Sequence, residues 1–325
     1  MRPVLNRRLF LKSAAVLSAL PMLPGIARAG SPLIFQASWT NDAEFAGYFL
    51  AIDRGYYSAE GLDLTYVPGG PDVIPEATLI AGKADLALTT PDTTISAITD
   101  QGGKFKIIGA QYQRNPVGIV SLAKNPIKTP ADMIGKTIAV PPVNTISVEA
   151  MLALNNIDKS KVNIVPYQYD PTPLIKGEID GSFDFVTNVP YTIKTMGEDS
   201  FSFLLYDFGY TIYNDTVVVT EDTLKTKRKD LVAWLKASRK GWTENLTDPA
   251  LWPPKWEKTW FNGTGRTIDN EVFYNTAQKP LIASDKGIFA MTEEGIAANI
   301  AALGKVGIKA TRAMFDTTLL AEAAG

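Results

Sequence analysis

The chain contains neither cysteine nor histidine among its 325 residues. Without cysteine there is no disulfide, no thiolate metal ligand and no thiol nucleophile. Without histidine there is no Ser-His-Asp triad, no imidazole general base and no histidine metal ligand. The sequence also lacks a G-x-S-x-G elbow, a P-loop and a metal-binding spacing. Composition therefore excludes the commonest routes to enzyme chemistry, and we expect no cofactor.

The first 29 residues have the features of an export signal. Arg7 and Arg8 precede a mildly apolar stretch at 13–26, and the Ala-Arg-Ala sequence at 27–29 matches a cleavage site. The apolar stretch is shorter than the ~20 residues that a permanent membrane span requires. We therefore expect twin-arginine export, cleavage near Ala29 and a periplasmic mature protein.

The balance of charge changes once this leader is removed. The whole chain has 32 basic and 34 acidic side chains, and five of the basic ones lie in the leader. The mature protein then carries 27 basic against 34 acidic groups, a mildly acidic balance that argues against a nucleic-acid partner. Its length of about 296 residues favours two lobes over one.

Short apolar or alternating runs are separated by helical segments over most of the first 220 residues. Strands that alternate with helices predict an α/β protein, with mostly parallel sheets flanked by helices. The runs predicted to be strands are 33–37, 61–67, 84–89, 104–111, 135–140, 162–167, 182–186, 203–206 and 215–220.

A long, extended and partly polar segment at 112–122 separates two such α/β units. It predicts a crossover between lobes, and 215–220 predicts the strand by which the chain returns. We expect lobe 1 to comprise 30–117 and 219–325, and lobe 2 to comprise 118–218.

The loop after the first predicted strand is rich in aromatic residues. Trp39, Phe45 and Tyr48 lie within ten residues, where a strand leads into a helix. Open α/β sheets bind ligands beyond the carboxyl ends of their strands, and aromatic rings offer flat apolar faces there. The three rings are therefore candidate ligand contacts, although each one alone is explained as well by a place in the core.

Polar and mostly uncharged side chains gather in the other loops that follow predicted strands. Hydroxyl, amide and aromatic groups suit a neutral or weakly charged ring that bears hydrogen-bond donors and acceptors. Each Asn or Thr alone fits a cap or turn as well, whereas five such loops together favour one shared cleft. The further candidate ligand-binding residues are Asn41, Glu44, Thr89, Thr90, Asp92, Arg114, Asn144, Thr145, Asn188 and Tyr191. Glu44 and Arg114 have a second interpretation, an ion pair that steadies the closed lobes.

Short motifs in a fixed order carry a family resemblance. They are Trp39, 44–48 (EFAGY), 55–57 (GYY), 60–63 (EGLD), 82–85 (GKAD), 113–116 (QRNP), 135–136 (GK), 177–180 (GEID) and 187–188 (TN). The ordered set resembles the thiamine-pyrimidine-precursor-binding and related periplasmic binding proteins of ABC importers. The likeness covers residues 33–220 and weakens toward 320. It implies a two-lobed, type II periplasmic-binding-protein fold with the ligand between the lobes.

Some members of the wider family are enzymes that build the thiamine pyrimidine from pyridoxal phosphate and consume an active-site histidine. Where that branch has the histidine, two residues before Gly47, this chain has Phe45. The chain also lacks the branch's cysteine-rich motif. The resemblance therefore implies a binding protein with no catalytic residue.

We expect an exported protein that captures a small heteroaromatic ligand and delivers it, as a monomer, to an ABC permease. A thiamine pyrimidine precursor is the first expectation and a flavin-like ring the next. One alternative is a binder of taurine or other sulfonates, in which helix N-termini near Asn41 and Asn144 hold the anion. Another is an enzyme that holds pyridoxal phosphate on Lys83 or Lys104.

Overall fold

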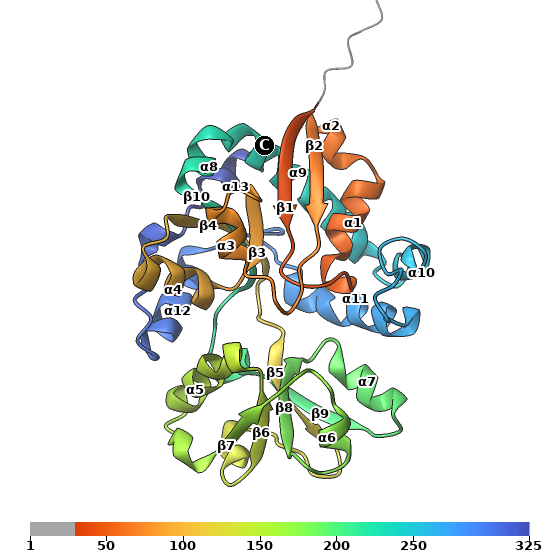
Figure 1. Ribbon diagram of the computed structural model, residues 1–325, viewed down its shortest axis with the longest axis vertical. Coiled ribbons are helices and arrows are strands. Elements are labelled where there is room, and N and C mark those ends of the chain that lie inside the picture. The colour runs from red at the N-terminus through yellow and green to blue at the C-terminus, as the bar shows by residue number, and fades with distance from the viewer. Residues whose placement is uncertain (1–29, 325) are drawn as a thin grey trace, which may run out of the picture.

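The computed structural model describes residues 30–324, and the predicted export signal lies outside that range. Two α/β lobes follow one another along the long axis of the molecule, each built on a five-stranded sheet (Figure 1). Within residues 30–324, no helix is long and apolar enough to cross a membrane. The two-lobed α/β architecture confirms the expected fold class.

The lobe 1 sheet has the strand order β2-β1-β3-β10-β4. β1 pairs in parallel with β2 and β3, while β10 runs antiparallel to both of its neighbours. The bounds of these strands are β1 Ser31–Gln36, β2 Leu62–Val67, β3 Leu86–Thr89, β4 Phe105–Tyr112 and β10 Asn214–Thr220. The arrowheads of β1 and β2 point toward lobe 2, so the loops that follow them face the other lobe (Figure 1).

Ten α-helices surround this sheet in the described part of the chain. They are α1 Ala46–Asp53, α2 Tyr56–Ala59, α3 Pro75–Ile80, α4 Pro91–Gln101, α8 Glu221–Thr226, α9 Arg228–Thr247, α10 Pro253–Trp256, α11 Ile268–Ile282, α12 Glu293–Gly304 and α13 Thr318–Glu322. α1 packs closely on α9 because glycines stand at the crossing. A Cβ on Gly47 would lie 2.1 Å from the Trp242 ring, and one on Gly241 would lie 2.1 Å from the Gly47 carbonyl oxygen.

Lobe 2 repeats the plan on a smaller scale, with the strand order β7-β6-β8-β5-β9. β6 is parallel to β7 and β8, and β5 is antiparallel to β8 and β9. Its strands are β5 Val117–Leu122, β6 Thr137–Val140, β7 Asn163–Pro166, β8 Gly181–Phe185 and β9 Ser200–Leu204. Its helices are α5 Thr145–Leu154, α6 Thr172–Ile175 and α7 Val189–Thr195.

Six short 3-10 helices complete the described chain. They are η1 Ala43–Phe45, η2 Pro130–Met133, η3 Pro142–Asn144, η4 Lys159–Lys161, η5 Leu205–Phe208 and η6 Arg312–Met314. η1 stands between β1 and α1, and η5 lies on the chain's return from lobe 2 to lobe 1.

The crossovers are shorter than the sequence suggested, and the return comes earlier. Most of the extended segment at 112–122 is strand, so only 113–116 passes between the sheets. Residues 214–218 were expected in lobe 2, yet they are β10 and lie inside the lobe 1 sheet. An isolated apolar strand does not reveal which sheet it joins, because that choice depends on long-range pairing. The antiparallel β10 and β5 also make both sheets mixed.

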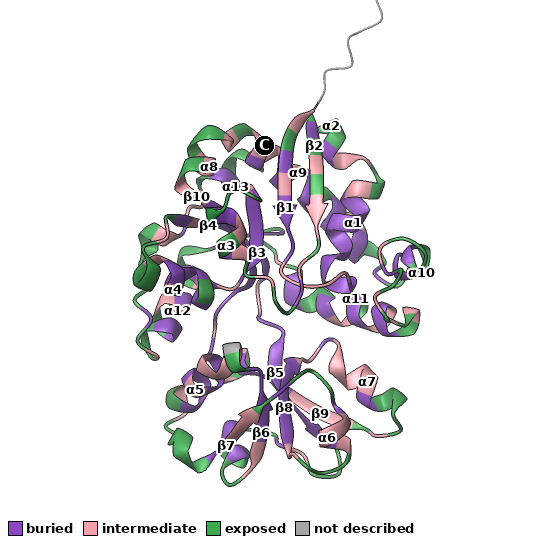
Figure 2. Cartoon of the chain, in the orientation of Figure 1, coloured by how far each residue is buried: buried purple, intermediate pink, exposed green. Residues whose placement is uncertain are grey.

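The central strands of both sheets are buried, whereas the outer helix faces and turns are exposed (Figure 2). Aromatic side chains fill much of the lobe 1 core. Tyr48 stacks on Trp234 at a centroid distance of 5.6 Å and on Phe289 at 6.2 Å. Such a core fixes the loop after β1 at the edge of lobe 1 that faces lobe 2.

Candidate functional site

Four of the side-chain contacts between the lobes each involve one residue predicted from the sequence. Trp39 lies edge-to-face on Tyr169, with 5.4 Å between ring centroids. Asn270 Nδ2 donates to Asn188 Oδ1 at 2.9 Å. The other two contacts are Tyr191 with Phe273, at a centroid distance of 5.4 Å, and Ser147 Oγ donating to Asp92 Oδ2 at 3.3 Å. We call this set of contacts the junction.

Asn144 also reaches the edge of the junction. Its Oδ1 lies 3.5 Å from the Tyr169 hydroxyl, at the limit of a hydrogen bond. Thr145 begins α5 directly after it and is half-buried. The structure thus brings loops from both lobes together, as the pattern of loops after strands predicted.

Several residues that were predicted to bind the ligand instead form hydrogen bonds within lobe 1. The Asn41 amide donates to the Trp260 carbonyl oxygen at 3.1 Å and accepts from the Tyr66 hydroxyl at 3.0 Å. The Thr89 hydroxyl donates to the buried Glu76 carboxylate at 2.6 Å. Thr90 stands as the residue before α4, with its hydroxyl 3.2 Å from that of Thr93. These groups hold the loops in shape.

Phe45 and Tyr48 are core residues. Both are 0 % exposed, and the Tyr48 ring is enclosed by aromatic side chains of α9 and the 284–292 loop. Neither ring has a face free for a ligand in this arrangement. Phe45 ends η1 and Tyr48 lies in the first turn of α1, and both side chains are buried in the lobe 1 core. We therefore omit both from the proposed site.

A cluster of buried acidic side chains lies behind Trp39. Ser38 Oγ is 2.9 Å from Asp215 Oδ1 and 3.2 Å from Glu44 Oε1. A serine hydroxyl has one hydrogen, so it satisfies both oxygens fully only if one of the carboxyl groups is protonated. Burial and the neighbouring charge of Asp215 raise the pKa of Glu44 well above its usual value, and we place the proton there. Glu44 is thus a buried group beside Asp215 and not half of an interlobe ion pair.

Two further carboxylates of the cluster are paired with one arginine. Arg266 Nη2 lies 2.8 Å from Asp42 Oδ2, and Arg266 Nη1 lies 3.9 Å from Glu271 Oε1. The same two carboxylates also bind the start of η1. Asp42 Oδ1 accepts from the Glu44 amide at 3.0 Å, and Glu271 Oε2 accepts from the Ala43 amide at 2.6 Å. The backbone donors that follow Asn41 are therefore already occupied by the protein's own carboxylates.

Lobe 2 contributes a second buried acidic group. Ser182 Oγ donates to Asp184 Oδ2 at 2.5 Å on β8. Asp184 Oδ1, the Tyr167 hydroxyl and the Thr187 hydroxyl have no hydrogen-bond partner among residues 30–324. Asp184 is near, and Thr187 just beyond, the carboxyl end of β8, and Tyr167 directly follows β7. Buried polar atoms without partners are uncommon in folded proteins.

Arg114 lies on the short segment between β4 and β5. It forms an ion pair with Asp207 of η5, so the pair ties the outgoing crossover to the returning one. Both side chains are close to half exposed, which limits such a pair to about 0–1 kcal/mol. Arg114 therefore lies on the segment that joins the lobes, and its charge is paired with that of Asp207.

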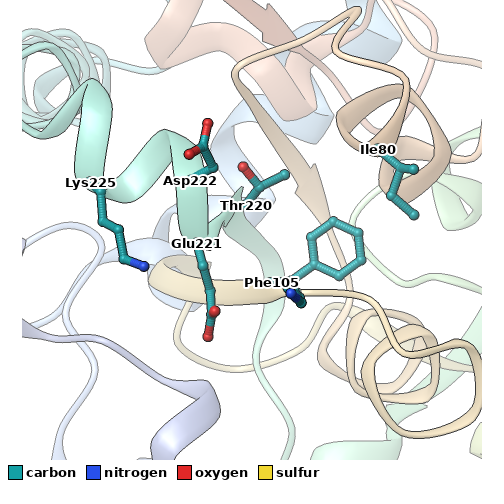
Figure 3. Close-up of a pocket in the computed structure, with 7 residues that line it drawn as sticks. Ile80, Phe105, Thr220, Glu221, Asp222 and Lys225 are labelled. Carbon is teal, nitrogen blue, oxygen red and sulfur yellow. The ribbon is translucent and has the colours of Figure 1, made fainter.

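Two cavities of the described chain lie elsewhere on lobe 1. One of about 320 Å³ is lined by residues that include Lys104, Phe105 and Lys225, where β4 starts and β10 ends (Figure 3). Because β4 runs parallel to β1, this is the sheet edge opposite the junction. The other, of about 520 Å³, lies beside Arg239 and α13. The lysines expected of a cofactor enzyme, Lys83 and Lys104, are exposed and both precede a strand.

The buried acids make a prediction for the pH dependence of stability. Burial raises the pKa of Asp184 and of Glu271 to about 7 and that of Asp215 to about 6. The folded state then holds more protons than the unfolded state from about pH 4.5 to pH 7, so stability falls as pH rises through this window. Each extra proton bound contributes about 1.4 kcal/mol per pH unit.

We expect urea unfolding to give a lower free energy of unfolding at pH 8 than at pH 5.5. Asp184→Asn should flatten this dependence, whereas the exposed control Asp72→Asn should leave it unchanged. A stability that rises between pH 5.5 and pH 8, or equal slopes for both variants, would contradict the protonation assigned to the buried acids.

The family model described as NMT1/THI5 like matches residues 42–251, which is more than half of the chain. The chain belongs to this family. The match includes η1, α1, the whole of lobe 2 and the whole of α9, whereas Trp39 and α11 lie outside it.

Two curated relatives of this NMT1/THI5-like protein are named for the ring compounds that they bind. A formylaminopyrimidine-binding protein of Halalkalibacterium halodurans is 26% identical over 223 residues, covering 66% of each chain. A riboflavin-binding protein, RibY, of Chloroflexus aurantiacus is 22% identical over 217 residues, covering 65% of this chain and 62% of the relative. The aligned part spans slightly less than two thirds of the length of either relative.

Solved structures share the fold at low sequence identity. The alkanesulfonate-binding protein SsuA of Xanthomonas axonopodis pv. citri, solved with MOPS, has a TM-score of 0.65 and 14% identity, covering 89% of this chain and 99% of its own. The desulfurization enzyme DSZB has a TM-score of 0.56 and 11% identity, covering 90% of this chain and 99% of its own. The periplasmic-binding-protein fold therefore occurs in both binding proteins and an enzyme.

The sequence interpretation missed several residues of the junction in this NMT1/THI5-like chain. Tyr169 follows β7, so the rule that selected the other loops would have found it. Phe273 and Asn270 lie on α11, and no local pattern links that helix to lobe 2. Ser38 and Asp215 gave no signal, because their proximity depends on the pairing of β10 within the sheet.

Proposed function

We propose that the protein captures a small heteroaromatic solute at the junction of its lobes and delivers it, as a monomer, to an ABC permease. A thiamine pyrimidine precursor is the first ligand class that we propose, and a flavin-like ring the second. Two relatives named for such ligands support this proposal. The observation that carries it is Trp39, which lies at the junction with buried carboxyl groups behind it.

Carboxyl groups suit the edge of an amino-substituted ring. A deprotonated carboxyl accepts hydrogen bonds from amino and ring N–H groups, and a protonated one also donates to a ring nitrogen. Glu44 and Asp215 stand one residue away from Trp39 through Ser38, and Asp184 stands on lobe 2. The ring face would meet indole while its edges meet these oxygens.

The acidic groups around Trp39 disfavour the alternative in which the protein binds a sulfonate. A sulfonate is a permanent anion and needs cationic side chains or free backbone amides. The amides at the start of η1 are bound by Asp42 and Glu271, and Arg266 is paired with those same carboxylates. The likeness to sulfonate-binding proteins extends to the fold, whereas the charges around Trp39 have the sign that repels an anion.

Closure of the lobes supplies the mechanism of capture. The contacts of Asn188 with Asn270 and of Asp92 with Ser147 exist only when the lobes meet. A ligand that touches both lobes binds this arrangement more tightly than an open one and shifts the population toward it. The permease would then recognise the closed pair of lobes. We propose no covalent step, and neither Lys83 nor Lys104 is near the junction.

A ligand panel tests the proposal through thermal unfolding. We expect an aminopyrimidine or riboflavin to raise the melting temperature and taurine to leave it unchanged. At a hundredfold excess over the dissociation constant, binding stabilises the folded state by about 2.7 kcal/mol. Stabilisation by taurine alone would contradict the heteroaromatic assignment. An adduct with pyridoxal phosphate that survives borohydride reduction would contradict the proposal that the protein binds its ligand without a covalent step.

A further inference from the structure

We infer that Tyr169 forms the lobe 2 wall of an aromatic slot, with Trp39 as the opposite wall, and that the ligand ring lies between the two. This inference rests on the proposed function and adds to it a specificity-determining residue outside the predicted site. It also restricts the ligand to a planar ring thin enough to enter between two side-chain rings.

The backbone at Tyr169 is unusual. Its φ is +59°, in the left-handed region that bulky side chains rarely adopt. Among residues 30–324, the other residues with positive φ that are not glycine are Asn156, Asp215 and Phe289. Asn and Asp tolerate this region because their short polar side chains bond locally. Tyr169 and Phe289 are therefore the two residues whose positive φ is unusual for their type.

The two outliers differ in how the surrounding structure holds them. Phe289 is 0 % exposed, stacks on Tyr48 and bridges its backbone to Ala110 of β4, so core packing maintains its conformation. Tyr169 is 43% exposed and lies in the loop between β7 and α6. Its strain is not compensated by burial in a core. Strained residues that are not needed for packing cluster at ligand-binding sites, where the conformation presents a side chain.

In this conformation the Tyr169 ring points toward lobe 1. The Tyr169 centroid lies 5.4 Å from that of Trp39 and 5.7 Å from that of Tyr167. A third ring between Trp39 and Tyr169 requires a separation of about 7 Å, twice the contact distance of about 3.5 Å. A small opening of the lobes, or rotation of the exposed Tyr169 side chain, provides this space.

Carboxyl groups of both lobes lie close to this slot. Partial burial raises the pKa of Tyr169 to about 12, and the carboxyl groups of Asp184 and Glu44 add to the effect when they are ionised. Asp184 belongs to β8 of lobe 2 and Glu44 to η1 of lobe 1. A ring held beside Tyr169 would therefore have hydrogen-bond acceptors toward two of its edges. The ligand class is a planar ring with N–H groups on its edges and no negative charge.

Three substitutions of Tyr169 separate the effect of its ring on ligand affinity from the effect of its strained backbone on stability. Tyr169→Phe keeps the ring, and we expect binding of an aminopyrimidine or riboflavin within twofold of the unsubstituted protein. Tyr169→Ala and Tyr169→Gly remove the ring, and we expect both to bind about tenfold more weakly, as one lost ring contact implies. Glycine tolerates positive φ, so Tyr169→Ala should melt about 2–4 °C below Tyr169→Gly.

Asn156 supplies the matched control, because it also has positive φ but lies after α5, in a turn away from the junction. Asn156→Gly and Asn156→Ala should show the same order of melting temperatures with unchanged affinity. Unchanged affinity in Tyr169→Ala and Tyr169→Gly, or an equal loss in Tyr169→Phe, would overturn the slot. If the unsubstituted protein binds no ring compound, it is the proposed function that fails.

Discussion

Replacing Trp39 with alanine is expected to weaken the binding of an aminopyrimidine or riboflavin by at least thirtyfold. Trp39 meets the opposite lobe at the junction, next to Ser38 and its buried carboxyl neighbours. A tryptophan at the centre of an interface typically contributes about 2 kcal/mol or more, and about 1.4 kcal/mol corresponds to a factor of ten. Isothermal titration calorimetry measures the change.

The stability of Trp39→Ala should change little, because the ring is only partly buried. Trp252→Ala is the matched control. Trp252 is 7% exposed, lies before α10 and contacts Arg54 and Lys255 rather than lobe 2. We expect this control to lower the melting temperature while affinity is retained. Retained affinity in Trp39→Ala would place the ligand somewhere other than the junction.

Replacing Arg266 with methionine is expected to reduce the free energy of unfolding by about 3–5 kcal/mol at pH 8, the usual effect of breaking a buried ion pair. The substitution leaves Asp42 and Glu271 buried without their positive partner. Burial already raises the pKa of Glu271 to about 7, with the charge of Asp42 adding to the effect. Protonation therefore relieves the repulsion in acid, and the loss should be smaller at pH 5.5. Urea unfolding at the two pH values measures both effects.

Arg114→Met is the control for this experiment, since its pair with Asp207 is nearly half exposed. We expect it to cost no more than about 1 kcal/mol at either pH. Adding Glu271→Gln to Arg266→Met should restore part of the lost stability, because one unpaired charge is removed. Equal effects of Arg266→Met at both pH values would contradict the cluster's charge assignment.

The sequence predicts the fold better than it predicts the connections within it. Alternation of β and α elements, and the loops after strands, are local features and led to Trp39, Asn188 and Tyr191 at the junction. The place of β10 in the lobe 1 sheet was missed, because a run such as 214–220 is equally apolar in either sheet. Sheet membership is decided by partners more than a hundred residues away.

Individual side chains show the same limit. The aromatic richness of the loop after β1 drew attention to Trp39, but it could not separate that ring from Phe45 and Tyr48, which are buried in the core. Glu44 was expected to contact the ligand or to form an interlobe ion pair, and in the structure it is buried and shares the Ser38 hydroxyl with Asp215. Burial of an acidic residue depends on partners supplied by distant segments, here β10 and α11.

A crystal structure of the protein with its tightest-binding ring compound tests the central claim most directly. We predict that the ring lies between the lobes against Trp39 and Tyr169, with an N–H group within hydrogen-bonding distance of Asp215, Glu44 or Asp184. A ring bound instead in the 520 Å³ cavity beside Arg239, with the junction empty, would contradict the account.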